Sequence, residues 1–183
     1  GRSWGWAERL PLGNALWSSS LVLASFMAGL AIGNGLGGRL AARLKRPLAT
    51  YAGLELVVGV SGAALVASLP HLTPLLLPAL RATTDAPALL LLVRAGSAFL
   101  LLLVPATAMG LTLPVLVEAL RRDDRRFAWT LGQLYGWNTA GAVAGALLGE
   151  LVLISALGMR GAGLAAAGLN LAAAGVALAL ERS

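Results

Sequence analysis

The sequence GNGLGG at residues 33–38 has the glycine spacing of a dinucleotide-binding loop, and Glu55 follows at about the distance of that loop's ribose-binding acid. Such a loop requires a strand before the glycines and a soluble helix after them. Here residues 20–32, SLVLASFMAGLAI, belong to an apolar stretch of membrane length, a basic turn follows, and Glu55 falls inside the next apolar stretch. This context argues against a nucleotide site, so the glycines need another interpretation.

Three ionisable side chains, Arg94, Glu150 and Glu55, interrupt otherwise apolar stretches. Charges inside a membrane are costly and mark either a function or an ion pair. Arg94 and Glu150 fall at similar depth in their stretches, so we expect them to form a structural ion pair that joins two helices. The alternative is a site for a polar or cationic solute, with Glu150 as its anionic anchor.

Glu55 has two interpretations as well. In the interpretation that we favour, its side chain extends toward Arg39 or Arg43. In the other, it lines an inner cavity with Asn34 and Asn138. Asn170, in the middle of the last apolar stretch, is expected to hydrogen-bond a neighbouring helix.

The sequence contains no carboxylate pair, Ser/His/Asp set or metal-binding cluster, and its single histidine, His71, has no second ligand nearby. We therefore expect a protein without enzymatic activity, cofactor or metal.

The composition predicts a protein embedded in lipid. Of its 183 residues, 58% are hydrophobic and only 12% are charged, whereas soluble domains carry about 25% charged residues. The net charge of +6 does not point to nucleic acid, because the basic residues cluster in short turns between apolar stretches. We expect the lipid bilayer as the main partner.

The chain is predicted to be an all-α polytopic membrane protein with five spans. Residues 1–14 form an outer segment, and the spans cover residues 15–37, 48–69, 88–120, 134–157 and 161–180. The third span is too long for one straight crossing of about 30 Å, and Pro105, Gly110 and Pro114 predict a kink in it. Residues 70–87 are predicted to be a loop that holds a short interfacial helix.

The distribution of Lys and Arg predicts the orientation. The turns after the first and third spans and the C-terminus hold nine of these residues, and the opposite side holds four. The positive-inside rule then places the C-terminus in the cytoplasm. Trp17, Trp129 and Trp137 fall near span ends, where interfacial aromatic residues are expected.

Two glycine stripes recur at four-residue spacing, which places each on one helix face. The stripes are Gly29, Gly33 and Gly37 in the first span and Gly141, Gly145 and Gly149 in the fourth. In lipid, small residues let helices approach closely. We therefore predict two tight helix contacts. In one possible arrangement, the two stripes face each other.

The basic turn GGRLAARLKRP, residues 37–47, resembles the cytoplasmic loop motif of the major facilitator superfamily, Gly-x-Leu-Ala-Asp-Arg-x-Gly-Arg-Arg. Ala42 and Leu44 depart from that motif. The residues assigned to it are Gly38, Arg39, Arg43, Lys45 and Arg46. Four further segments, LVLASFMAGLAIG, PATAMGLTLPVL, LYGWNTAGAVAGALL and ALGMRGA, resemble in order the membrane domain of spermidine synthase-like proteins.

This resemblance covers residues 6 to 180 and implies a half major-facilitator bundle whose helices 2–6 are visible. It also implies a first helix before Gly1 and an aminopropyltransferase-like domain after Ser183. The implied function is a non-catalytic domain of the inner membrane that anchors the protein and binds a polar or cationic solute such as a polyamine. The alternatives are an accessory subunit packed on other membrane subunits and a homodimeric half-transporter.

Overall fold

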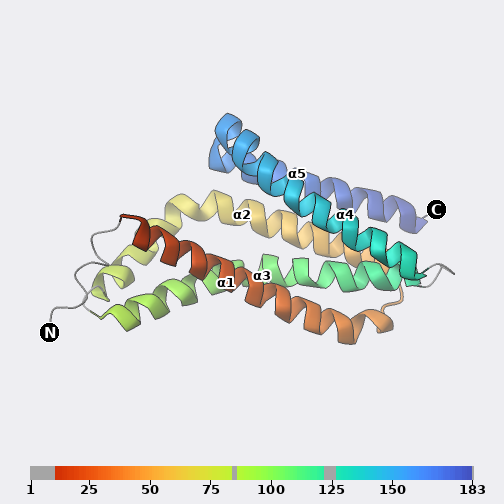
Figure 1. The fold of residues 1–183 in the computed structure, drawn as a ribbon, viewed down its shortest axis with the longest axis horizontal. Coiled ribbons are helices and arrows are strands. Elements are labelled where there is room, and N and C mark those ends of the chain that lie inside the picture. The colour runs from red at the N-terminus through yellow and green to blue at the C-terminus, as the bar shows by residue number, and fades with distance from the viewer. Residues whose placement is uncertain (1–10, 84–85, 122–126, 183) are drawn as a thin grey trace.

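A computed structural model describes residues 11–83, 86–121 and 127–182 (Figure 1). In chain order the elements are α1 (Pro11–Leu40), the short η2 (Ala41–Arg43), α2 (Pro47–Ala82), α3 (Pro87–Arg121), α4 (Phe127–Leu148), the π-helical η3 (Gly149–Ile154) and α5 (Ser155–Arg182). The predicted all-α class is confirmed.

Four helical stretches are long and apolar enough to cross a membrane: Ser19–Arg43, Pro47–Leu72, Ala88–Arg121 and Phe127–Arg182. The last of these contains two antiparallel arms, because the chain reverses near the start of α5 (Figure 1). Gly158 makes this reversal with φ 67° and ψ 176°, a backbone conformation that is essentially restricted to glycine. The reversal falls between the two segments expected as the fourth and fifth spans.

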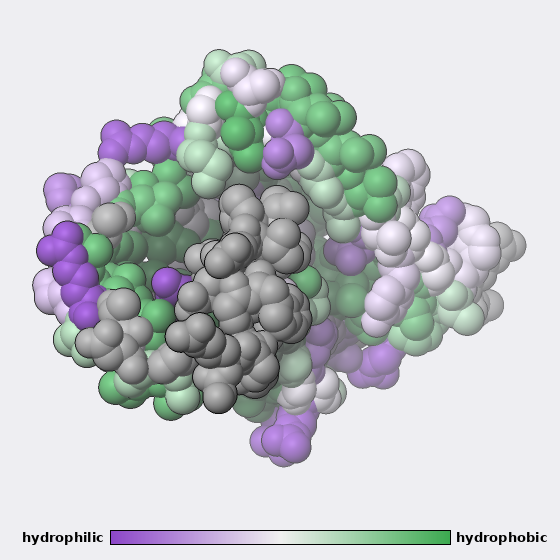
Figure 2. Space-filling model, turned by 60° about the vertical axis from the view of Figure 1, so that its left-hand side comes forward, coloured by the Kyte–Doolittle hydropathy of each residue, from purple (hydrophilic) through white to green (hydrophobic). Residues whose placement is uncertain are grey.

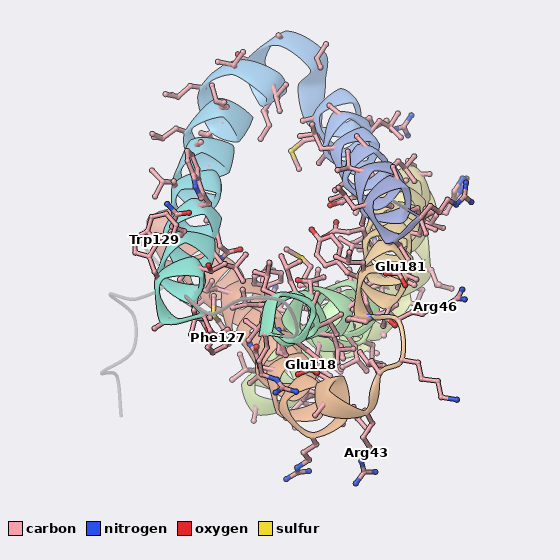
Figure 3. The ribbon with its side chains drawn as sticks, turned by 90° about the vertical axis from the view of Figure 1, so that its right-hand side faces the viewer. Arg43, Arg46, Glu118, Phe127, Trp129 and Glu181 are labelled. Atoms are coloured by element: carbon pink, nitrogen blue, oxygen red, sulfur yellow. The ribbon has the colours of Figure 1, made fainter. Side chains whose placement is uncertain are left out.

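The basic turn after α1 and the C-terminal end of the chain lie at the same end of the molecule (Figure 1). The start of α4 lies at this end as well (Figure 1). Figure 3 looks onto it and shows Arg43 and Arg46 pointing away from the helices. The arrangement agrees with the sidedness expected from the basic residues, and the assignment of this end to the cytoplasm stays a prediction.

The predicted loop at residues 70–87 is wrong, because α2 continues through Pro70, Pro74 and Pro78 to Ala82. Proline removes one backbone donor and clashes with the carbonyl one turn earlier, and a modest bend relieves that clash. An apolar environment gives the other backbone groups no water to bond, so the helical hydrogen bonds persist around each proline. α3 likewise passes through Pro105 and Pro114 as one helix.

Small residues fill the contacts between helices, and large ones face outward. Ala106 has none of its surface exposed, and Ala52, Ala174 and Ala177 form a small cluster against Tyr51. By contrast, the outward-facing Leu100 and Leu169 are each 70% exposed. Figure 2 shows hydrophobic side chains over much of one face. This pattern suits a lipid environment, where apolar surface need not be buried.

The helices pack to very different extents. α1 lies along α3, while α2 contacts both α3 and α5. α4 has no buried residue over its 22 residues, and outside its continuation into η3 its main contact is a slight one with α3.

Candidate functional site

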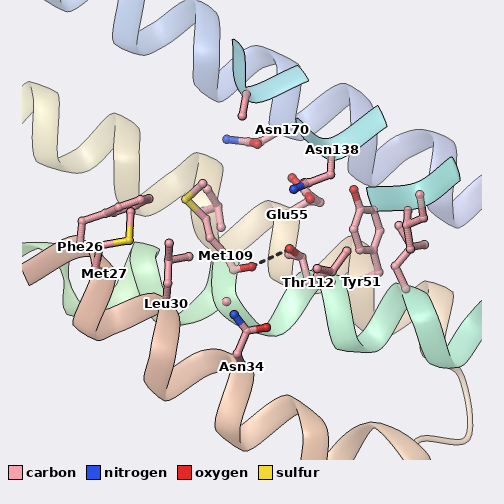
Figure 4. Close-up of a pocket in the computed structure, with 16 residues that line it drawn as sticks. Phe26, Met27, Leu30, Asn34, Tyr51, Glu55, Met109, Thr112, Asn138 and Asn170 are labelled. Carbon is pink, nitrogen blue, oxygen red and sulfur yellow. Dashed lines mark hydrogen bonds between the residues drawn. The ribbon is translucent and has the colours of Figure 1, made fainter. Parts of the chain in front are cut away.

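A cavity of about 520 Å³ lies between the helices, and residues from α1, α2, α3, α4 and α5 line it (Figure 4). Most of its lining is apolar. The polar side chains that line it are Asn34, Tyr51, Glu55, Thr112, Asn138 and Asn170. Such a lining, mostly apolar with a few polar groups, is typical of sites for small molecules.

Glu55 is the only carboxylate among the described lining residues, and no Lys, Arg or His accompanies it there. The side chain is partly buried. One helical turn earlier on α2, Tyr51 places its hydroxyl beside the Glu55 carboxylate (Figure 4), as residues at i and i+4 can. Tyr51 in turn packs on the alanine cluster between α2 and α5, which fixes the position of the phenol.

Three asparagines from three different helices project toward the same space as Glu55. Asn34 comes from α1, Asn138 from α4 and Asn170 from α5 (Figure 4). Asn170 lies at the α2–α5 contact, where a Cβ placed on Gly59 would be 3.3 Å from the Asn170 Cβ. The cavity can therefore offer amide oxygens and amide N–H groups around a single negative charge.

Thr112 has a more restricted role. Its hydroxyl donates a hydrogen bond of 2.7 Å to the Met109 carbonyl oxygen within α3. Because that hydrogen is already used, the hydroxyl oxygen can only accept a hydrogen bond from a molecule in the cavity.

The structure brings together four of the six polar residues singled out from the sequence, namely Glu55, Asn34, Asn138 and Asn170. This is the cavity alternative for Glu55, and the favoured approach to Arg39 or Arg43 is not seen: its partner is Tyr51. Asn170 faces the cavity as well as the helix contact at which it was expected.

Arg94 and Glu150 do not form the expected pair. Both side chains are exposed, and the ion pair seen in the described part of the chain joins other residues, Glu118 and Arg121. Similar depth along the membrane normal was a poor guide because it contains no information about lateral position. Glu150 lies in η3, away from the α1–α3 and α2–α3 contacts that hold α3 in place.

The first glycine stripe lies against α3. A Cβ on Gly29 would come 2.5 Å from the Ala106 Cβ, one on Gly33 would overlap the Thr107 carbonyl oxygen, and one on Gly37 would be 2.8 Å from Pro114. Close approach of the two helices therefore requires glycine at these positions.

The second stripe has no such contact, which corrects the prediction of a tight interface there. A Cβ on Gly141, Gly145 or Gly149 would meet no atom within 4 Å. The two stripes also do not face each other, since the partner of the first one is α3. The physical reason is that α4 stands apart from the packed helices.

Sequence reasoning missed several residues that the structure makes prominent. Tyr51 could have been found from its i, i+4 spacing to Glu55. Glu118 is buried near the C-terminal end of α3, and Arg121 donates two hydrogen bonds to its carboxylate, Nε to Oε2 at 2.9 Å and Nη2 to Oε1 at 3.1 Å. The i, i+3 spacing of this pair was the available signal.

The residues of the predicted loop motif lie on the surface at the basic end. Gly38, Arg39, Arg43, Lys45 and Arg46 are all exposed. Trp129 and Trp137 are also largely exposed, at 63% and 76%, as interfacial aromatic residues would be. The side chain of Trp17 and residues 1–10 lie outside the described part of the structure.

No protein-family model, curated protein or solved structure matches the chain.

Proposed function

We propose that this chain is a non-catalytic integral membrane domain that binds an organic cation in its central cavity, with Glu55 as the anionic anchor. The observation that carries the proposal is the charge of the lining: one carboxylate and no basic side chain among the described lining residues. The length and apolar composition of the helices support the membrane role.

The energetics of a partly buried carboxylate between apolar helices favour this ligand class. A charged side chain in a membrane is expensive unless a partner compensates it. The neighbouring Tyr51 hydroxyl is polar but brings no opposite charge. A cation that enters the cavity would supply that charge in a medium of low dielectric constant, where the attraction is stronger than in water. The amide oxygens of Asn34, Asn138 and Asn170 would accept its remaining hydrogen bonds.

The sequence segments support a more specific proposal for the context of this domain. Their resemblance to spermidine synthase-like proteins favours a half-facilitator bundle in the inner membrane, with the basic end in the cytoplasm. In that setting the bundle anchors a cytoplasmic domain and holds a solute near it.

The test uses the purified chain in lipid nanodiscs and a panel of hexylamine, spermidine, hexanol and hexanoate, with binding followed by calorimetry. We expect binding by at least one of the amines and by neither the alcohol nor the acid. Glu55→Gln should weaken amine binding by about tenfold or more. The matched control is Glu150→Gln, which changes an exposed carboxylate outside the cavity and should leave binding unchanged. Equal amine binding by the Glu55→Gln protein would refute the proposal.

The isolation of α4 favours a second candidate, an accessory subunit or homodimer that uses this helix as its contact. α4 has no buried residue, and its glycine stripe meets no atom. The chain contains no cysteine, so Val143→Cys, at a position of α4 that is 57% exposed, provides a single crosslinking site. A disulfide-linked dimer in native membranes would support the homodimer, and crosslinking to a different protein of defined stoichiometry would support the subunit. A protein that stays monomeric under oxidation would count against both.

A further inference from the structure

We propose that the cavity selects an amphiphilic monocation, a molecule with one ammonium group and an apolar body, over a polyamine. This inference rests on the proposed cation site and specifies its ligand class. It also departs from the polyamine that the sequence resemblance implies.

The first step is the count of charges. One bound ammonium would neutralise Glu55, which is the only charged group in the described lining. A second or third ammonium on the same ligand would lie among neutral side chains. Amide and hydroxyl oxygens can accept its hydrogen bonds, but they do not offset the loss of its hydration in an apolar surrounding.

The second step is the separation of polar and apolar side chains within the cavity. Figure 4 shows Tyr51, Glu55 and Asn138 in one part, and Phe26 and Met27 in another, with Asn34, Met109 and Asn170 between them. The apolar part would favour a hydrocarbon body, and thioether and aromatic side chains adapt well to such ligands. The far end of a bound amine would therefore meet a surface that disfavours a second charge.

The third step is size. The volume of about 520 Å³ lies in the range of sites for small organic molecules, about 300–1,000 Å³. An inorganic ion such as K⁺ would fill only a small part of it, and the remaining apolar surface would have no contact. The cavity therefore matches a ligand that carries its own apolar volume.

The experiment compares two amines of equal chain length in nanodiscs. Hexylamine and 1,6-diaminohexane differ only in the second ammonium at the far end. We expect hexylamine to bind about tenfold or more tightly than 1,6-diaminohexane or spermidine, and this binding to be lost in Glu55→Gln. KCl at equal charge concentration should not compete with hexylamine.

A second pair of variants tests the apolar part directly. Met27 lines the cavity and is 51% exposed, so the fold should tolerate a change there. Met27→Glu adds a carboxylate at the far part and should shift the preference toward 1,6-diaminohexane by about tenfold. Met27→Gln, similar in size but neutral, should leave the preference for hexylamine in place.

The outcomes separate this inference from the proposed function. Tighter binding of 1,6-diaminohexane or spermidine that depends on Glu55 would overturn the monocation and keep the cation site. If K⁺ competed with hexylamine and bound with a similar affinity, that result would also overturn the monocation and keep the cation site. Amine binding that survives Glu55→Gln would be adsorption to lipid, and that result, like the absence of binding, would overturn both.

Discussion

Two glycine stripes with the same spacing have opposite surroundings in this protein. The stripe on α1 lies so close to α3 that a Cβ on Gly33 would overlap backbone atoms, whereas a Cβ on Gly145 of α4 would meet nothing within 4 Å. The difference arises from the partner helix. α3 carries its own small residues, Ala106 and Gly110, at the same four-residue interval, so two complementary faces meet.

The α4 stripe borders the cavity instead. At 3.6 residues per turn, Gly141 and Gly145 project on the same side of α4 as Leu134 and Asn138, which line the cavity. Because glycine has no side chain to project from that side of the helix, room is left there for a bound molecule. A small-residue stripe thus shows that a helix face allows close approach, and the neighbouring helices decide whether anything approaches it.

The largest expected effect breaks the α1–α3 contact. Gly33→Leu should lower the free energy of unfolding by about 3 kcal/mol, because its side chain would overlap the backbone of Thr107 and Gly110. Gly145→Leu is the matched control on α4 and should be nearly neutral. Reversible unfolding in mixed detergent micelles measures both. Equal losses would show that the two stripes pack alike.

The next effect concerns how the α4–α5 hairpin is held. α4 has little lateral support, so its position depends on the turn at Gly158, where φ is 67°. Gly158→Ala should cost about 2 kcal/mol, since a side chain strains this backbone conformation. Gly168→Ala, in a helical position with open space around it, should be neutral or slightly stabilising. The same unfolding assay compares them, and equal stability of the two variants would contradict the assigned turn.

The smallest expected effect tests whether α4 and η3 ever pack against α3. Arg94 and Glu150 are exposed and unpaired with each other in the structure. A double-mutant cycle of Arg94→Leu and Glu150→Leu should therefore give a coupling energy below about 0.5 kcal/mol. A coupling several times larger would mean that the hairpin closes against α3 in the membrane.

Much of the fold could be predicted because it depends on local composition. Apolar stretches of membrane length specify helices. Polar side chains within them avoid lipid and face the space between the helices. A shared cavity lining of Glu55, Asn34 and Asn138, which the structure shows, was the alternative to the favoured approach of Glu55 to Arg39 or Arg43.

Two of the errors have a common physical origin, which is that the sequence of a single helix does not specify its lateral neighbours. The pairing of Arg94 with Glu150 required two helices to be adjacent, and the α4 contact required a complementary face. The loop at residues 70–87 failed for another reason. Proline ends helices where water can replace the lost hydrogen bonds, and that alternative is weak in lipid.

The length of the α2–α3 hairpin has a consequence for the bilayer. α2 has 36 residues and α3 has 35, so at 1.5 Å per residue each is roughly 50 Å long, against about 30 Å of hydrocarbon. Apart from Arg81 and Arg94, the excess is mostly apolar, with Leu75 and Leu92 exposed at 71% and 67%. The hairpin is therefore subject to hydrophobic mismatch. A thin bilayer leaves more of its leucine surface in the headgroup region than a thick one, so the free energy of the hairpin in the membrane depends on bilayer thickness.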